Sequence, residues 1–344
     1  MRIPTDLRTR FLRHYQSLPH LSHSSSLTHN LLKPLLPLIS STKTSYENLP
    51  NNDRIKRFEG GRYFGAGRWF DASCYVFNGI LIDTSPSSCY PHLPTSDFEQ
   101  ILLTHHHEDH SGSLGPFLPT HQIYMSQKTL DIMSMSRGKF DMQFYEHLLY
   151  GEPLEFKLNE DSNVNIIEDG GYLPTWNSDG REVEGYVYTT PGHSEDMLVY
   201  HVPSENAVFA GDLYLNENRF FFRSDECYTS ILSSIDKILD LPDWDILLCA
   251  HEPIFEGGRD KLKKKREYLE RIGDNIIRLH NAGLSDIEIS RSVFPRASGM
   301  WYLWVICGGD VSPVNIVRSV LYGPVERDSI KRALNDNGEN IENR

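Results

Sequence analysis

The segment from Thr104 to Gly112 holds the most chemically informative residues of the chain. It reads Thr-His-His-His-Glu-Asp-His-Ser-Gly and contains the pattern His-x-His-x-Asp-His. Imidazole nitrogens and carboxylate oxygens suit zinc and other divalent transition metals. His105 and His107 are two residues apart, so their side chains share one face if the segment is extended. Asp109 and His110 follow where a helix would begin and are aimed elsewhere, so one loop offers ligands to two metal ions.

Three later segments each place one more ligand-type side chain at the end of an apparent strand. These are His193 after a Pro-Gly turn, Asp212 in Ala-Gly-Asp and His251 in Cys-Ala-His. Each of them alone would more often be structural than catalytic. Their joint occurrence, in this order, predicts the further ligands that a dinuclear metal site needs. His106 occupies a variable position of the motif and receives no ligand role.

Short apolar strands that alternate with helices position these residues. Asn78-Gly79 predicts a hairpin turn because both residue types tolerate positive φ. The strands on either side of it are Tyr75–Phe77 and Ile80–Ile82. Further strands are expected at 98–104, 185–190, 207–210 and 246–249, and helices at 127–150 and 231–239. This alternation is typical of an α/β fold.

A helical region follows Gly257-Gly258. A charged helix is expected from Lys261 to Arg278. A second helix begins at Ser285, which forms a capping box with Glu288, and a third begins at Ser312-Pro313.

Taken together, these motifs resemble those of the metallo-β-lactamase-fold hydrolases, in particular the glyoxalase II-like branch. The resemblance covers about residues 55–258, and Asp83 in Leu-Ile-Asp-Thr is its first motif. It implies a four-layer αββα sandwich with a C-terminal helical segment and with the site at one edge of the two sheets. It also implies two metal ions, the first bound by His105, His107 and His193, the second by Asp109, His110 and His251, with Asp212 as the bridge.

The same resemblance implies further roles. Asp109, a metal ligand, also takes the proton from the incoming water, and Asp83 orients metal ligands. The best-known true lactamases have a cysteine at the position of Asp212, which argues against an antibiotic substrate.

The expected function is that of a metallo-hydrolase. Two divalent ions, Zn²⁺ or else Fe or Mn, bring the pKa of a shared water towards neutrality for attack on a small ester, thioester or lactone. One alternative is a non-heme iron oxidoreductase such as a persulfide dioxygenase. The complete set of seven ligands favours two metals over a single iron. Another alternative is a phosphodiesterase or nuclease of the RNase Z kind.

Composition argues against nucleic-acid and membrane partners, which leaves the small-molecule substrate that the resemblance implies. The net charge is −13 over 344 residues, which disfavours nucleic acid because phosphate binding depends on Lys and Arg. No stretch approaches the ~18–20 apolar residues of a membrane-spanning helix. The five cysteines are odd in number and show no Cys-x-x-Cys pair, which favours reduced thiols and a cytoplasmic location. The composition does not indicate an oligomeric state.

We divide the chain into three parts. Residues 1–52 carry six basic and two acidic residues and form an N-terminal extension, either helical or an organellar targeting segment. Residues 53–258 form the catalytic domain, and residues 259–344 form the C-terminal helical region.

Overall fold

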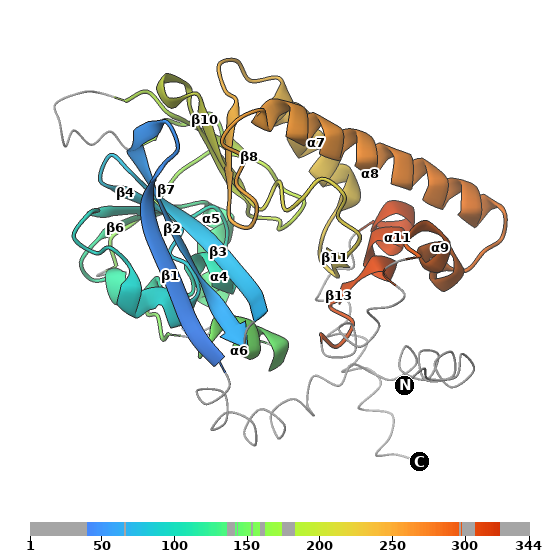
Figure 1. The fold of residues 1–344 in the computed structure, drawn as a ribbon, viewed down its shortest axis with the longest axis horizontal. Coiled ribbons are helices and arrows are strands. Elements are labelled where there is room, and N and C mark those ends of the chain that lie inside the picture. Colours follow the sequence, from blue (N-terminus) through green and yellow to red (C-terminus); the bar gives the residue numbers. More distant parts are fainter. Residues whose placement is uncertain are drawn as a thin grey trace, which may run out of the picture.

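Two β-sheets pack face to face, with helices on their outer faces. The computed structural model describes residues 40–64, 67–135, 142, 144–152, 154–158, 162–173, 183–295, 297 and 307–323. In this part of the chain the layers follow the order helix, sheet, sheet, helix, as expected for the αββα sandwich (Figure 1).

The first sheet has seven strands in sequence order within the described residues. They are β1 (Ser40–Leu49), β2 (Asn52–Phe64), β3 (Gly67–Phe77), β4 (Ile80–Ile82), β5 (Gln100–Leu102), β6 (Gln122–Met125) and β7 (Val164–Ile166). β1 to β4 pair antiparallel, and β4 to β7 pair parallel. The predicted hairpin between β3 and β4 is confirmed, with φ of 51° at Asn78 and 76° at Gly79.

The second sheet has the strand order β12-β10-β9-β8. Its strands are β8 (Tyr186–Thr189), β9 (Leu198–Val202), β10 (Ala207–Gly211) and β12 (Ile246–Cys249). Three strands expected from the sequence are therefore confirmed, β12 with the same ends and β8 and β10 with slightly different ones. A separate pair joins β11 (Phe222–Arg223) to β13 (Val311–Ser312).

Side-chain alternation along the strands builds the core between the sheets. Leu102 of β5, Phe209 of β10 and Leu248 of β12 all belong to this inner cluster and are almost fully buried. Their sequence neighbours point to the opposite faces, as the two-residue period of a strand requires. Each fully buried side chain of this size contributes roughly 1.5–3 kcal/mol to the free energy of folding.

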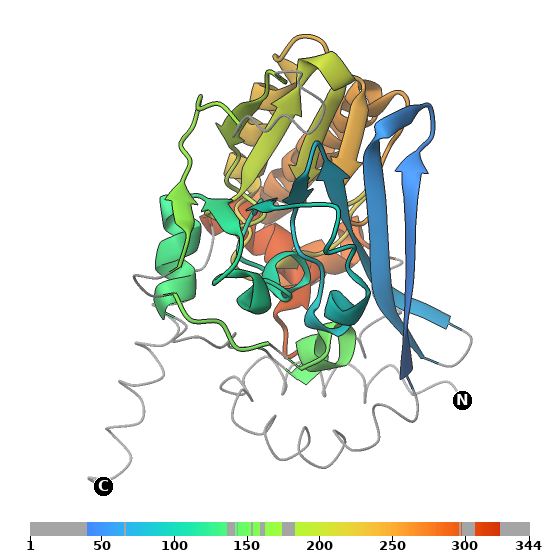
Figure 2. The same cartoon turned by 90° about the vertical axis from the view of Figure 1, so that its left-hand side faces the viewer.

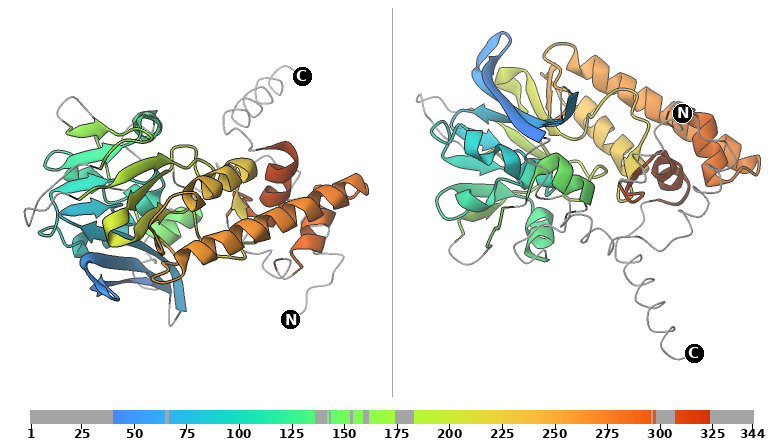
Figure 3. Two further views of the ribbon diagram at one scale, coloured as in Figure 1. Left: turned by 90° about the horizontal axis from the view of Figure 1, so that it is seen from above. Right: turned by 60° about the horizontal axis from the view of Figure 1, so that its bottom comes forward.

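The outer faces of the sheets pack on helices. Ile101 of the first sheet packs in one cluster with Met133 of α5 (Gln127–Met135). Val208 and Leu247 of the second sheet share another cluster with Ile276 of α8 (Gly258–Asn281). Figure 3 shows α7 (Tyr228–Leu239) and α8 against the second sheet, on the side away from the first sheet.

The helices confirm most of the expected pattern. They are α4 (Glu108–Ser111), α5 (Gln127–Met135), α6 (Phe144–Tyr150), α7 (Tyr228–Leu239), α8 (Gly258–Asn281), α9 (Asp286–Val293) and α11 (Pro313–Tyr322), with short 3-10 turns at Ser87–His92, Gly115–Phe117 and Pro203–Glu205. The capping box at Ser285 and Glu288 is present. The single helix expected over 127–150 was wrong, since α5 ends at Met135 and α6 begins at Phe144; residues 136–141 and 143 lie outside the described part.

Part of the expected N-terminal extension belongs to the sheet. β1 pairs with β2 from Ser40 to Leu49 and forms the sheet edge, visible in blue in Figure 2. The strand is polar because most of its side chains are exposed, so it lacks the apolar alternation that would have indicated it. Residues 1–39 lie outside the described part, so the helical and targeting interpretations both stay predictions, as do the domain boundaries.

The described residues bear on two further expectations, which concern the state of the cysteines and membrane-spanning helices. All five cysteines are present there as free thiols. No helix in the described ranges combines the length and apolarity that crossing a bilayer demands.

Candidate metal centre

The predicted ligands all follow the ends of strands. His105 and His107 lie just beyond β5, and α4 begins at Glu108, immediately before Asp109. The other three residues, His193, Asp212 and His251, follow β8, β10 and β12 of the second sheet. Because both sheets end at the same edge of the sandwich, residues far apart in the sequence meet there.

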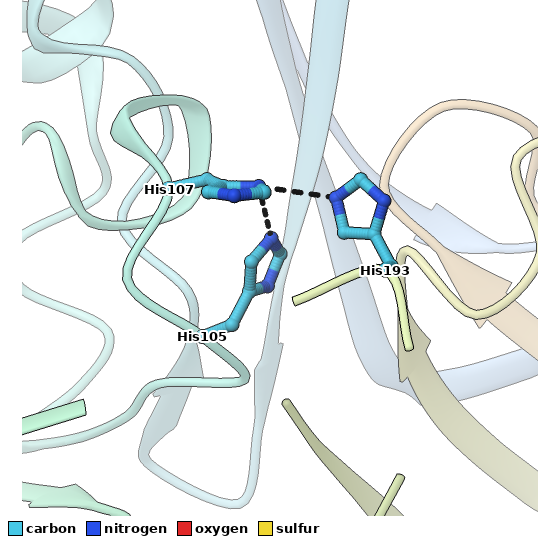
Figure 4. Close-up of side chains that lie close together, drawn as sticks. All are labelled: His105, His107 and His193. Atoms are coloured by element: carbon cyan, nitrogen blue, oxygen red, sulfur yellow. Dashed lines mark hydrogen bonds between the residues drawn. The ribbon is translucent and has the colours of Figure 1, made fainter. Parts of the chain in front are cut away.

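The three histidines of the first group converge on one point. The Nδ1 atom of His107 lies 3.0 Å from Nε2 of His105 and 3.0 Å from Nε2 of His193. Figure 4 shows the three rings arranged around this point, and His193 lies on a different segment of the chain from His105 and His107. All three residues are buried.

The second group brings two histidines and two carboxylates together. Oδ2 of Asp109 lies 3.2 Å from Nε2 of His251 and 3.7 Å from Nε2 of His110. Asp212 belongs to this group, with Oδ1 3.3 Å from Nε2 of His110 and Oδ2 3.4 Å from Nε2 of His251. The side chain of His251 is 18% exposed, whereas the other members are buried.

Asp212 also touches the first group. Its Oδ2 atom lies 3.2 Å from Nε2 of His193. One carboxylate therefore faces both groups at once, which is the position that the sequence analysis expected for a bridging residue. All seven predicted residues are brought together.

The spacing of these atoms suits small divalent cations. A tetrahedral zinc ion with bonds of about 2.0–2.1 Å separates its ligand atoms by ~3.3 Å. The contacts around His107 and Asp212 fall close to this value. Nε2 of His110 and Oδ1 of Asp212 are buried and lack a hydrogen-bond partner among the described residues. A bound cation would satisfy both atoms, so the donor set fits two metal ions.

Burial sets the protonation of two members of the first group, His105 and His107. It lowers the pKa of His105 well below its usual range, and His110 lowers it further. It lowers the pKa of His107 in the same way, with a further decrease from Arg223. Both rings are therefore neutral at physiological pH, which is the form that binds metal.

The second group is an ion-paired cluster. Burial alone would lower the pKa of His251, but Asp212 and Asp109 raise it to about 9. Burial alone would raise the pKa of Asp212, but the imidazoles of His251 and His110 hold it well below the usual range. The carboxylates are thus ionised at neutral pH, and a divalent cation would take the place of the histidine protons.

Asp83 contacts His110, one of the candidate ligands, in line with the orienting role that the resemblance implies. Its Oδ2 accepts a hydrogen bond from Nδ1 of His110 at 2.7 Å. Its Oδ1 accepts one from the backbone N–H of Thr104 at 2.7 Å. This contact leaves Nε2 of His110 as the nitrogen that faces Asp109 and Asp212.

Sequence reasoning missed Asp196, a buried carboxylate beside the centre. The buried Asp196 accepts hydrogen bonds from the backbone N–H and the ring Nδ1 of His106, both at 2.9 Å. The ring of His106 is therefore directed to Asp196, in line with the absence of a ligand role. Asp196 lies on the same loop as His193 and so ties the two metal-binding loops together. No sequence pattern marked it, because its partner is 90 residues away.

Two glycines permit the close approach of these loops. Gly211, directly before Asp212, has φ of 49°, and a Cβ there would lie 2.9 Å from Oγ1 of Thr104. Gly192, directly before His193, has φ of 144°, and a Cβ there would lie 2.6 Å from the backbone N of Ile231. Only glycine meets both demands without strain.

Comparison with known families agrees with this geometry. A family profile described as the metallo-beta-lactamase superfamily matches residues 67–251, which is more than half of the chain. The chain belongs to the metallo-beta-lactamase superfamily. The matched region extends from β3 to His251 and so contains all seven residues of the metal centre.

Within this superfamily, individual relatives are distant. A hydroxyacylglutathione hydrolase from Bartonella henselae is 26% identical over 45% of this chain and 49% of its own length. The match thus spans about half the length of that relative. The lactamase-like protein nscB from Arthroderma gypseum is 27% identical over 74% of this chain and 68% of its own length. A metallo-beta-lactamase family protein of known structure from Thermus thermophilus has a TM-score of 0.47 and 16% identity, covering 86% of this chain and 94% of its own.

Proposed function

We propose that the protein is a hydrolase that uses two divalent metal ions to attack a small ester, thioester or lactone with water. The observation that carries this proposal is the position of Asp212, whose two carboxylate oxygens face both ligand groups. A single-metal enzyme would not need the second group. When bound, two such ions lower the pKa of water and polarise the group under attack.

The residues of the chain would supply the other parts of the reaction. His105, His107 and His193 would hold one ion, and Asp109, His110 and His251 the other, with zinc the expected metal and iron or manganese as alternatives. Asp109 would also accept the proton of the attacking water. Burial alone would raise its pKa, but His110 and His251 lower it, so the carboxylate is ionised and ready to accept a proton.

Two lines of reasoning support the substrate class. The relatives named as hydroxyacylglutathione hydrolases act, by that name, on an acyl compound. The residue at position 212 is an aspartate rather than the cysteine of the best-known lactamases. Neither line of reasoning specifies the acyl group. The substrate should therefore be sought with a panel of esters, thioesters and lactones.

The decisive experiment combines metal quantification with that panel. We expect the purified protein to contain two divalent ions per chain and to hydrolyse at least one class of the panel. His107→Ala should abolish turnover and leave the fold largely intact. His280→Ala is the matched control, because this exposed histidine of α8 is remote from the metal centre. Its substitution should change neither the metal content nor the rate of hydrolysis.

The alternatives predict different results. One iron per chain, with oxidation of persulfides and no hydrolysis, would replace the proposal by the dioxygenase. Cleavage of RNA or of phosphodiesters, with no acyl substrate turned over, would replace it by the nuclease. Full activity of His107→Ala would refute the dinuclear mechanism.

A further inference from the structure

A buried carboxylate lies behind His193, on the side of the ring away from the other ligands. Oε1 of Glu226 lies 3.5 Å from Nδ1 of His193. The opposite ring nitrogen, Nε2, faces His107 at 3.0 Å and Asp212 at 3.2 Å. The imidazole therefore stands between Glu226 and the point at which the first ligand group converges.

Glu226 is held firmly in this position. Arg219 donates two hydrogen bonds to it, from Nη1 to Oε2 and from Nη2 to Oε1, both at 2.6 Å. The backbone N–H of Arg223 donates a third at 2.9 Å. Glu226 is 0% exposed, so the pair is removed from water. Bidentate pairing of this kind fixes orientation as well as charge.

Little else is available to pair with Nδ1 of His193. This atom is buried and lacks a hydrogen-bond partner among the described residues. The cavity beside it, lined by His193, Asp212, Arg219, Glu226 and Lys265 among others, measures about 10 Å³. That volume holds one water molecule at most. The amine of Lys265 donates to the backbone carbonyl of Leu213, so it serves the Asp212 loop.

We propose that Glu226, fixed by Arg219, is the positioning residue of the first metal ion. It accepts the proton on Nδ1 of His193, so that Nε2 is the unprotonated nitrogen that faces the metal. Histidine ligands commonly donate their second N–H to a carboxylate, which sets the tautomer and makes the ring a better ligand. A contact of 3.5 Å is long for a hydrogen bond, but hydrogen bonds at catalytic sites are often long in ligand-free structures and tighten on binding. The inference rests on the proposed function, because His193 must be a ligand.

The structure offers a matched counterpart in the second ligand group. Asp83 accepts from Nδ1 of His110 as Glu226 would from Nδ1 of His193. Each carboxylate directly contacts one histidine of one group. The two metal ions should therefore respond separately to changes at Asp83 and at Glu226, which a general loss of stability would not produce.

The test measures Zn²⁺ affinity against a competing chelator, and the absorption spectrum of the Co²⁺-substituted protein. We expect Glu226→Gln to weaken one of the two sites by about 10–100-fold and to alter its Co²⁺ bands, while the other site keeps its wild-type affinity. Asp83→Asn should weaken the other site. Glu226→Asp should recover part of the lost affinity.

A second variant separates the loss of metal affinity from a general failure to fold. Glu226→Gln leaves the buried Arg219 without its charge partner, so the double change Arg219→Met and Glu226→Leu removes the whole pair and fills its volume. Apolar replacement of a buried ion pair is often neutral for stability. This variant should fold and show the same selective loss of one metal site.

The remaining outcomes overturn the inference. If the folded double variant binds metal at both sites with wild-type affinity, Glu226 does not position His193 for metal binding. An equal loss at both sites, together with lower stability of the metal-free protein, would show a purely structural pair. Failure of the wild-type protein to bind two ions is a separate result, and it would remove the proposed function and this inference together.

Discussion

The carboxylate of Asp83 connects two strands of the first sheet to a ligand of the second group, accepting from Nδ1 of His110 at 2.7 Å. The same side chain accepts from the hydroxyl of Thr104, which follows β5. Asp83 lies directly after β4 and has φ of 61°. Aspartate and asparagine tolerate this conformation better than most residues. The sheet thus fixes the orientation of a ring that lies outside it.

Asp83→Asn should therefore weaken one metal site selectively. Asparagine keeps the size and the tolerance for positive φ but loses the negative charge opposite His110. We expect about 10–100-fold lower metal affinity at one site, with the other unchanged. Chelator competition with Zn²⁺ measures both affinities. Uniform loss at the two sites would contradict the assignment.

Substitution of Asp212 should have a different signature. Its carboxylate faces His110 and His193, which belong to different groups. We expect Asp212→Ala to lose both metal ions and all turnover, whereas His193→Ala and His251→Ala each lose one ion. Elemental analysis after equilibration at equal Zn²⁺ concentration gives the stoichiometry. An Asp212→Ala protein that keeps one tightly bound ion would show that Asp212 does not bridge.

Asp196 should contribute to both stability and metal binding. It holds His106 by two contacts and also accepts a hydrogen bond from the hydroxyl of Thr129 at 2.8 Å. Asp196→Ala would leave these buried donors without a partner, at a cost of roughly 2–4 kcal/mol in the free energy of unfolding. Urea unfolding of the metal-free protein measures this cost. Thr129→Val removes the hydroxyl that donates to Asp196 and that also lies 2.8 Å from Oγ of Ser126, and it should cost less, about 1–2 kcal/mol.

The contact between Asp196 and His106 also joins the loop that carries His193 to the loop that carries His105 and His107. We therefore expect Asp196→Ala to weaken the first metal site in addition to the fold. A variant with lower stability but unchanged metal affinity would show that the two loops keep their positions without this contact.

Sequence reasoning succeeded where a residue was marked by its local pattern. The candidate ligands, which the structure brings together, could be found because imidazoles two residues apart, or a carboxylate after a short apolar strand, are visible in a few consecutive residues. Asn78-Gly79 marked its hairpin for the same reason, since a two-residue turn depends on local φ preferences.

The residues that were missed depend on distant partners. Glu226 is an ordinary surface residue type in the sequence, and only the fold brings it to His193, 33 positions away. Strand β1 was missed because an exposed edge strand needs no apolar face, and its polar composition instead favoured an extension. The break between α5 and α6 was missed because both segments are apolar enough for one continuous helix.

The pH dependence of the metal-free protein tests the electrostatics of the second group. Asp212 and Asp109 outweigh burial and raise the pKa of His251 to about 9, above the ~6.5 of an unfolded histidine. A raised pKa in the folded state means that the stabilisation is complete below pH ~6.5 and is lost as the pH rises through about 9. In the presence of chelator, the free energy of unfolding of the wild type should exceed that of His251→Gln most at pH 6. The excess should fall by on the order of 1–3 kcal/mol by pH 9.5.

Taking the difference between the two proteins cancels every pH effect that they share, including contributions from groups remote from the metal centre. His251→Gln also loses the hydrogen bond between Nδ1 of His251 and the carbonyl of Asp71, and this adds a constant offset that drops out when the difference at pH 6 is compared with the difference at pH 9.5. Added Zn²⁺ should reverse the trend in the wild type, because metal binding requires the neutral imidazole and therefore strengthens as the pH rises. Denaturant unfolding at several pH values, with and without Zn²⁺, provides both measurements. A difference that stays constant from pH 6 to pH 9.5 would mean that His251 is not ion-paired in the metal-free protein.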